Sequence, residues 1–142
     1  MSSSDVILAA LTSVTMAQPT PATPARAPRA PAVSEAQAHE LALSTLVSWA
    51  RRLPQTSFEH LSPERNADRF YWFQILAETG ADRSPNLGFY AVNKATGDVW
   101  EIPACERRRS AAISRWQQGL PRRAGVSARE IRRLSAIAPC EP

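Results

Sequence analysis

The pattern of apolar positions predicts a helix directly after residue 34. Ser34 and Gln37 have the spacing of a capping box, in which each side chain bonds the other residue's backbone. Apolar residues then recur three and four positions apart, which predicts one amphipathic helix of about five turns from residue 35 to Leu53, stopped by Pro54. Its inward stripe is Ala38, Leu41, Ala42, Thr45, Leu46, Trp49 and Leu53.

A run of aromatic and β-branched residues follows and predicts an antiparallel sheet of three strands. Residues 69–77 form the first strand, and both of its faces are largely apolar. Residues 87–93 form the second strand and 98–102 the third, with Gly97 where a tight hairpin needs a left-handed residue. Residues 54–68 are polar and are expected to be irregular.

Two helical patterns follow the sheet. The first runs from about 107 to 118, with Gly119 as its C-cap and Pro121 as its stop. The second opens on a capping box of Ser127 and Glu130. Because strands and helices are segregated along the chain, we expect an α+β fold. Its N-terminal helix packs on a three-stranded antiparallel meander, and two C-terminal helices follow.

Residues 1–33 differ in composition from the rest of the chain. Residues 6–17 form an apolar run that is too short for a membrane span but has the length of a signal-peptide core, although no Lys or Arg precedes it. Residues 18–33 contain five prolines, which favours an extended, disordered linker. We therefore expect a signal peptide over 1–17, a linker over 18–33 and a single domain over 34–142, in a periplasmic or secreted protein without a stable membrane span after cleavage. The alternative for the first segment is a disordered tail or a lone buried helix.

The two cysteines, Cys105 and Cys140, each follow a predicted element. In an exported chain a disulfide between them is the default expectation, with two unrelated buried thiols as the alternative. A reactive Cys105 thiol beside the cations of residues 107–109 is a weaker alternative. Neither a CxxC motif nor clustered histidine accompanies the pair, so it predicts no metal site.

Catalytic chemistry has little support in the sequence. The chain has two histidines. His39 falls off the apolar stripe and His60 lies in the region expected to be irregular, so both are expected to be surface residues without a catalytic partner. The five glycines form no phosphate-binding loop. We expect no enzyme, no cofactor, no bound metal and no small-molecule substrate.

Positive charge is concentrated at the C-terminal end. Residues 105–142 carry nine arginines and three acidic residues. This segment could meet an acidic protein face, a phosphate or a membrane surface. Three of the arginines would start a helix, where cations oppose the helix dipole, and this favours an anionic partner. An uncovered sheet face would add an aromatic docking surface. The candidate partner-binding residues are Tyr71, Phe73, Arg107, Arg108, Arg109, Arg122, Arg123, Arg129, Arg132 and Arg133.

Residues 120–134 also resemble a helix-turn-helix DNA-binding unit, with Gly125 at the turn. Arg129, Arg132 and Arg133 would then face phosphates or bases. Pro121 falls inside the required first helix, and an exported chain would not meet DNA. Nucleic acid is therefore an unlikely partner, and DNA binding is kept as an alternative function.

The helix of residue 35 onward, followed by Phe89-Tyr90-Ala91-Val92-Asn93-Lys94-Ala95-Thr96-Gly97-Asp98-Val99-Trp100, resembles PepSY-type and similar small cystatin-like secreted domains. The resemblance covers residues 35–102, and the two basic helices and the cysteine pair lie outside it. It implies an extracytoplasmic, non-catalytic module that binds or inhibits another protein. Small exported α+β proteins also include immunity proteins, which neutralise toxins. We expect an exported inhibitor or immunity-type factor; a helix-turn-helix protein and a structural envelope protein are the alternatives.

Overall fold

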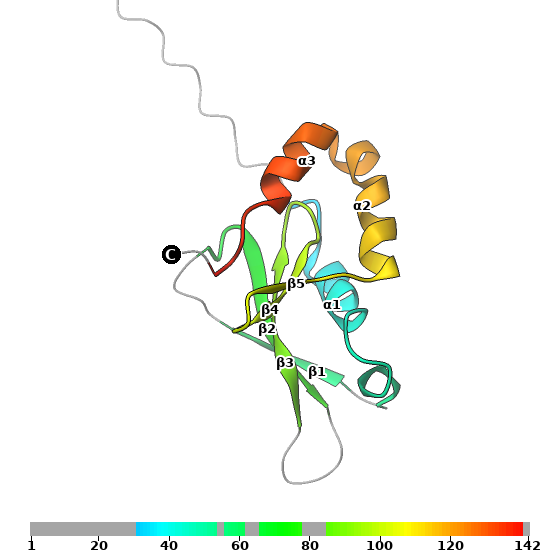
Figure 1. The fold of residues 1–142 in the computed structure, drawn as a ribbon, viewed down its shortest axis with the longest axis vertical. Helices are drawn as coiled ribbons and strands as arrows, with labels where there is room; N and C mark the ends of the chain where they lie inside the picture. The colour runs from blue at the N-terminus through cyan, green and yellow to red at the C-terminus, as the bar shows by residue number, and fades with distance from the viewer. Residues whose placement is uncertain (1–30, 54–55, 62–65, 78–84, 141–142) are drawn as a thin grey trace, which may run out of the picture.

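The computed structural model describes residues 31–53, 56–61, 66–77 and 85–140 (Figure 1). Within these ranges the chain forms a five-stranded antiparallel sheet in which every strand pairs with the next one along the chain. The predicted α+β class is confirmed, and the predicted three strands are the central ones of the five. The elements are α1 (Glu35–Leu43), the 3₁₀ helix η1 (Ala50–Arg52), β1 (Thr56–His60), β2 (Phe70–Ala77), β3 (Asn86–Asn93), β4 (Val99–Ile102), β5 (Glu106–Arg108), α2 (Ala111–Ala124) and α3 (Ala128–Ser135).

Helix α1 begins as predicted but ends early. The capping box of Ser34 forms in full. The helix ends at Leu43, far short of the predicted Leu53, because the next two residues turn their hydroxyl groups back onto it. Ser44 and Thr45 both donate to carbonyls of the last helical turn, which competes with further helix formation.

The two edge strands replace predicted irregular and helical segments. β1 lies in the stretch expected to be irregular and pairs with β2, with His60 opposite Phe73. β5 contains Arg107 and Arg108, which were expected to begin a helix. Helix α2 instead begins at Ala111, after Ser110 as its N-cap. The argument from an unfavourable helix dipole is therefore wrong for these arginines.

Helix α2 continues past both of its predicted stop signals. Gly119 and Pro121 lie inside it, and Gly125 takes the left-handed C-cap conformation with φ 60°. Leu120 lies between these two residues and is fully buried, so its burial stabilises the turn that the proline weakens. Ser127 caps α3 as predicted by accepting a hydrogen bond from the backbone of Glu130.

The main core lies between one face of the sheet and the helices α1 and α2 (Figure 1). Val33, the last residue of the expected linker, is fully buried there, and its backbone N–H donates to the carbonyl of Lys94 at 3.0 Å. The residues of this core are Val33, Ala38, Leu41, Ala42, Leu46, Ala50, Phe73, Ile75, Tyr90, Val92, Val99 and Ile113.

The chain after α3 returns to the sheet. The side-chain amide of Asn93 donates to the carbonyl of Leu134 at 3.2 Å. Cys140 then forms a disulfide with Cys105, in the turn between β4 and β5, as predicted. The basic helices are therefore fastened to the sheet at both ends. None of the helices in the described ranges has the length and apolar character that a membrane crossing requires. The expected signal peptide and most of the expected linker lie outside those ranges.

Candidate functional site

The aromatic residues that the sequence suggested for docking lie on the covered face of the sheet. Phe73 is completely buried. Tyr71 is half-buried, its hydroxyl donates to the carbonyl of Val33 at 3.0 Å, and the ammonium group of Lys94 lies over its ring. The expected aromatic docking face around these two residues is therefore wrong.

The arginines of β5 are engaged within the fold. Arg107 donates to the carboxylate of Asp98, whose side chain is only 1% exposed. Arg108 lies 3.2 Å from Glu101 and 3.4 Å from Glu106. Arg109 lines a small pocket beside them, at the start of α2. Arg107 and Arg108 thus have carboxylate partners within the fold, so their charges are less available for ion pairs with another molecule.

Asp98 is the centre of a buried hydrogen-bond network. Thr96 donates its hydroxyl to one carboxylate oxygen at 2.7 Å, and Gln117 donates its side-chain amide to the other at 2.6 Å. With Arg107, these bonds join the β3–β4 turn, β5 and α2. The network explains why a carboxylate is buried here, and it fixes where α2 lies.

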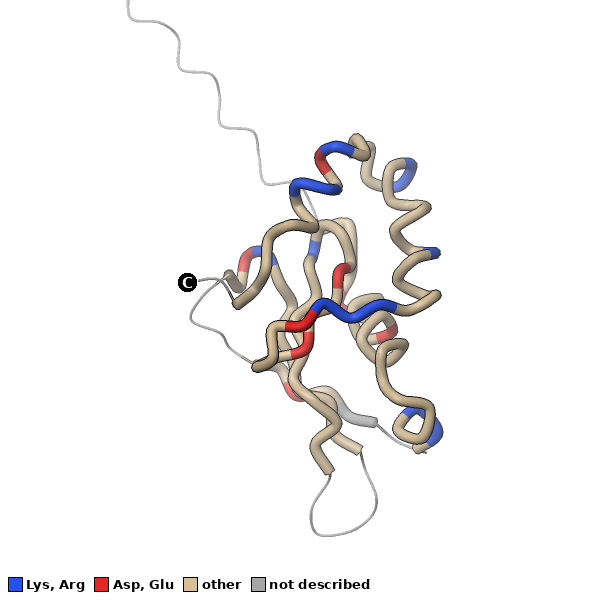
Figure 2. The backbone as a smooth tube through the Cα atoms, viewed as in Figure 1, with Lys and Arg blue, Asp and Glu red and all other residues tan. Residues whose placement is uncertain are grey.

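The helices α2 and α3 form an exposed cationic surface, which we call the basic hairpin (residues 111–135; Figure 2). Two of its arginines have partners within it. Arg123 stacks over the ring of Trp116 at 3.9 Å, and Arg133 donates two hydrogen bonds to Glu130, which lower the pKa of that carboxyl group. Among the described residues, no carboxylate lies within ion-pair distance of the remaining exposed arginines of the hairpin, Arg115, Arg122, Arg129 and Arg132.

The turn after α1 presents two large apolar side chains to solvent. Val47 is 51% exposed and Trp49 is 59% exposed. Sequence reasoning placed Trp49 on the inward stripe of a long helix, and the early end of α1 makes that prediction wrong. The signal for it was the concentration of weak helix formers after Leu43: Ser44, Thr45, Val47 and Ser48.

A shallow groove of about 360 Å³ adjoins this turn, between α1, η1 and the first turn of α2. Its walls are mainly apolar, and Arg51 is among the residues that line it. We call Val47, Trp49, Arg51, Arg52 and this groove the Trp49 surface. The other residues that line the groove are Glu40, Leu41, Leu43, Ser44, Leu53 and Ala112.

The two histidines do not lie where the sequence suggested. His60 is the last residue of β1, and its Nε2 is 2.7 Å from a carboxylate oxygen of Glu35. His39 is not a surface residue: its ring stacks on Phe58, and its Nε2 is buried without a hydrogen-bond partner in the described ranges. Burial lowers the pKa of His39. The prediction of a surface residue is confirmed for His60, which is 54% exposed, but the expectation that it lies in an irregular segment without a partner is wrong. For His39, which is half-buried, the surface prediction is wrong.

The structure removes one objection to the helix-turn-helix hypothesis for residues 120–134, namely that Pro121 would interrupt the first helix. Pro121 does not interrupt α2, and a short turn of residues 125–127 joins it to α3. Arg129 and Arg132 are exposed on α3. The hypothesis remains a prediction, as does the resemblance to PepSY-type domains.

No family model matches the chain, and no curated protein has a matching sequence. A similar chain occurs in a solved structure of a type VI secretion system effector-immunity complex from Pseudomonas protegens. The two chains are 22% identical, the match covers 78% of this chain and 91% of that one, and the TM-score is 0.52. At this identity the likeness establishes a shared fold.

Proposed function

We propose that this protein is an exported, non-catalytic module that binds another protein as an inhibitor or immunity-type factor, through the Trp49 surface. The observation that carries the proposal is the 59% exposed tryptophan, which lies two residues before Arg51, a residue that lines the mainly apolar groove. Tryptophan and arginine are the residues most enriched at the energetic centres of protein interfaces, and Trp49 is followed closely by Arg51 and Arg52.

The turn that presents Trp49 is anchored on both sides. Leu46 and Ala50 are 6% and 2% exposed and belong to the main core. The hydroxyl groups of Ser44 and Ser110 lie 2.7 Å apart, which ties the end of α1 to the start of α2. A side chain held in this way loses little conformational entropy on binding, so more of its contact energy becomes affinity.

Charge indicates the kind of partner. The arginines of η1 and those of the basic hairpin lie at opposite ends of the molecule (Figures 1 and 2). A protein with an acidic surface would be attracted by both, and such long-range attraction mainly increases the association rate. We assign the short-range contact to the Trp49 surface and the long-range attraction to the basic hairpin.

Two further observations support the immunity-type role. The fold is shared with a chain from an effector-immunity complex. The disulfide of Cys105 and Cys140 suits an oxidising compartment such as the periplasm, where a factor that neutralises an incoming toxin would meet it.

The test begins with capture of the partner by the full chain in its own host, followed by measured binding kinetics. Trp49→Ala should weaken binding at least about 30-fold, through faster dissociation, as expected for an interface centre worth about 2 kcal/mol. A double variant Arg129→Ala/Arg132→Ala should slow association and flatten its salt dependence, and leave dissociation unchanged. Equal binding by the native chain and Trp49→Ala would refute the assignment of the site, and failure to capture any protein would refute the function.

DNA binding by residues 120–134 is the second candidate function, and the continuity of α2 through Pro121 favours it. It predicts that the full chain binds duplex DNA with an affinity that falls steeply with salt, and that Arg129→Ala/Arg132→Ala reduces this slope. Export of the native protein, shown by fractionation and intact mass, would exclude it.

A further inference from the structure

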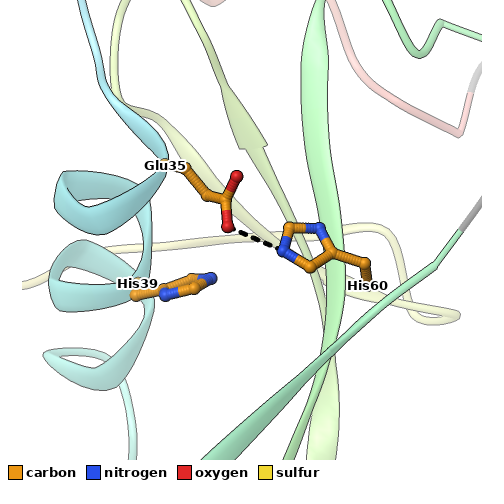
Figure 3. A group of neighbouring side chains, drawn as sticks. All are labelled: Glu35, His39 and His60. Atoms are coloured by element: carbon orange, nitrogen blue, oxygen red, sulfur yellow. Dashed lines mark hydrogen bonds and ion pairs between the residues drawn. The ribbon is translucent and has the colours of Figure 1, made fainter.

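Beyond protein binding, the structure gathers three metal-ligating side chains between α1 and the edge strand β1 (Figure 3). Glu35 and His39 are four residues apart on α1, so they lie on the same face of the helix, one turn from each other. His60 reaches the same place from the end of β1, on the side of the sheet that α1 covers. One ligand atom from each residue lies within 4.8 Å of the others.

His39 is the fixed member of the group. Its ring is parallel to that of Phe58 at a centroid distance of 3.9 Å and perpendicular to that of Phe73 at 5.0 Å. Its buried Nε2 has no hydrogen-bond partner within the described ranges, a costly state for a polar atom that has lost its water.

Glu35 and His60 are the adjustable members. Their side chains are 52% and 54% exposed, and in the structure they bond to each other at 2.7 Å. Zn²⁺ with ligand bonds of about 2.0–2.1 Å needs ligand atoms about 3.4 Å apart. Rotations of these two exposed side chains would have to separate their own ligand atoms from 2.7 Å to that spacing and bring both to the same distance from His39. The metal would then replace the hydrogen bond between Glu35 and His60.

Two imidazole nitrogens and one carboxylate oxygen form a donor set suited to Zn²⁺ and similar late transition metals, and poorly suited to Mg²⁺ or Ca²⁺. Three protein ligands leave a fourth position for water or for a group from another molecule. We propose that Glu35, His39 and His60 form a Zn²⁺ site that joins α1 to β1. The site satisfies the buried nitrogen of His39 and links the edge strand to the helix.

The chain has two histidines, so imidazole signals in an NMR spectrum report on this cluster alone. The experiment uses the full, disulfide-bonded chain without a polyhistidine tag, freed of metal by chelation and titrated with Zn²⁺. We expect saturable binding of one Zn²⁺, detected by calorimetry and by competition with a coloured chelator. Both histidine ring signals should shift together, and the melting temperature should rise.

The variants His60→Ala and Glu35→Gln test the site without disturbing the core, because both side chains are exposed. Each should weaken Zn²⁺ binding at least about tenfold. Glu59→Gln is the matched control, because it also removes one negative charge but from a side chain on the opposite side of the strand to its neighbour His60. This variant should bind Zn²⁺ as the native chain does. Absence of saturable binding, or equal binding by the native chain and His60→Ala, would overturn the proposal.

Discussion

Replacement of Asp98 by alanine provides the most quantitative test of how the basic hairpin is held on the sheet. The change removes the hydrogen bonds that the carboxylate accepts from Thr96, Gln117 and Arg107. Each bond to a charged group contributes about 1.5–3 kcal/mol. The share of Arg107 is smaller because its side chain is 36% exposed and partly screened by water. Since the three bonds are not additive, we expect the free energy of unfolding to fall by about 3–4 kcal/mol, as for other broken buried pairs.

The assay is urea denaturation of the disulfide-bonded protein near neutral pH, followed by tryptophan fluorescence and circular dichroism. Asp98→Asn keeps the shape and one acceptor oxygen, so we expect about half of the loss. Asp68→Ala is the matched control: its side chain is 79% exposed and lies 3.9 Å from Arg69, and its removal should cost less than about 0.5 kcal/mol. The reasoning would be refuted if Asp98→Ala lowered the free energy of unfolding by less than about 1 kcal/mol while the slope of that free energy against urea concentration stayed the same.

Three further outcomes are expected. Replacing Cys105 and Cys140, which are 35 residues apart, with alanine should lower the free energy of unfolding by about 3–4 kcal/mol in urea titrations, and an unchanged midpoint would contradict the loop-entropy estimate. Gly97→Ala should lower the melting temperature, because φ is +72° and the new Cβ would lie 2.8 Å from the ring of Trp116; an unchanged value would show that the ring moves freely. Because burial lowers the pKa of His39 below its ordinary 6.5, its contribution to stability is present above pH 6.5 and is lost as the pH falls toward the folded-state pKa. In urea titrations, His39→Gln should remove this part of the pH dependence of the free energy of unfolding. An identical pH profile for the native chain and the variant would contradict the role of His39.

Local signals explain the part of the fold that the sequence predicts correctly. The caps at Ser34 and Ser127 depend on residues within three positions of each other, and the hairpin at Gly97 depends on one left-handed residue. The disulfide is predictable because two cysteines allow a single pairing. In each case the residues that determine the structure either lie within a few positions of each other or have only one possible partner in the chain.

The edge strands could not be predicted in the same way. β5 contains three charged residues and no apolar alternation, so its pairing with β4 is the reason that it forms a strand. In β1 the inward positions include Phe58 and His60, whose partners Ile75 and Phe73 lie 17 and 13 residues further along the chain, beyond the reach of a local periodicity. Strand formation in both places is a tertiary effect.

The candidate sites were missed for the same reason, because each depends on an element boundary that the sequence did not predict. Glu35 and His60 are 25 residues apart in sequence, and nothing places them together until β1 is recognised as a neighbour of α1. Trp49 is exposed only because α1 ends at Leu43. Sequence periodicity treats every apolar residue as part of the interior, so an exposed tryptophan has no distinct pattern before the end of the helix is known.

The disulfide also has a topological consequence. Together with the peptide chain between Cys105 and Cys140, it closes a covalent ring that contains β5, α2 and α3, and with them nine of the arginines of the protein. A single proteolytic cut anywhere within this ring would leave both fragments attached to the sheet. A protein that works outside the cell, among proteases, would therefore keep its cationic segment after an initial cleavage, and would lose it only when the disulfide is reduced or a second cut is made.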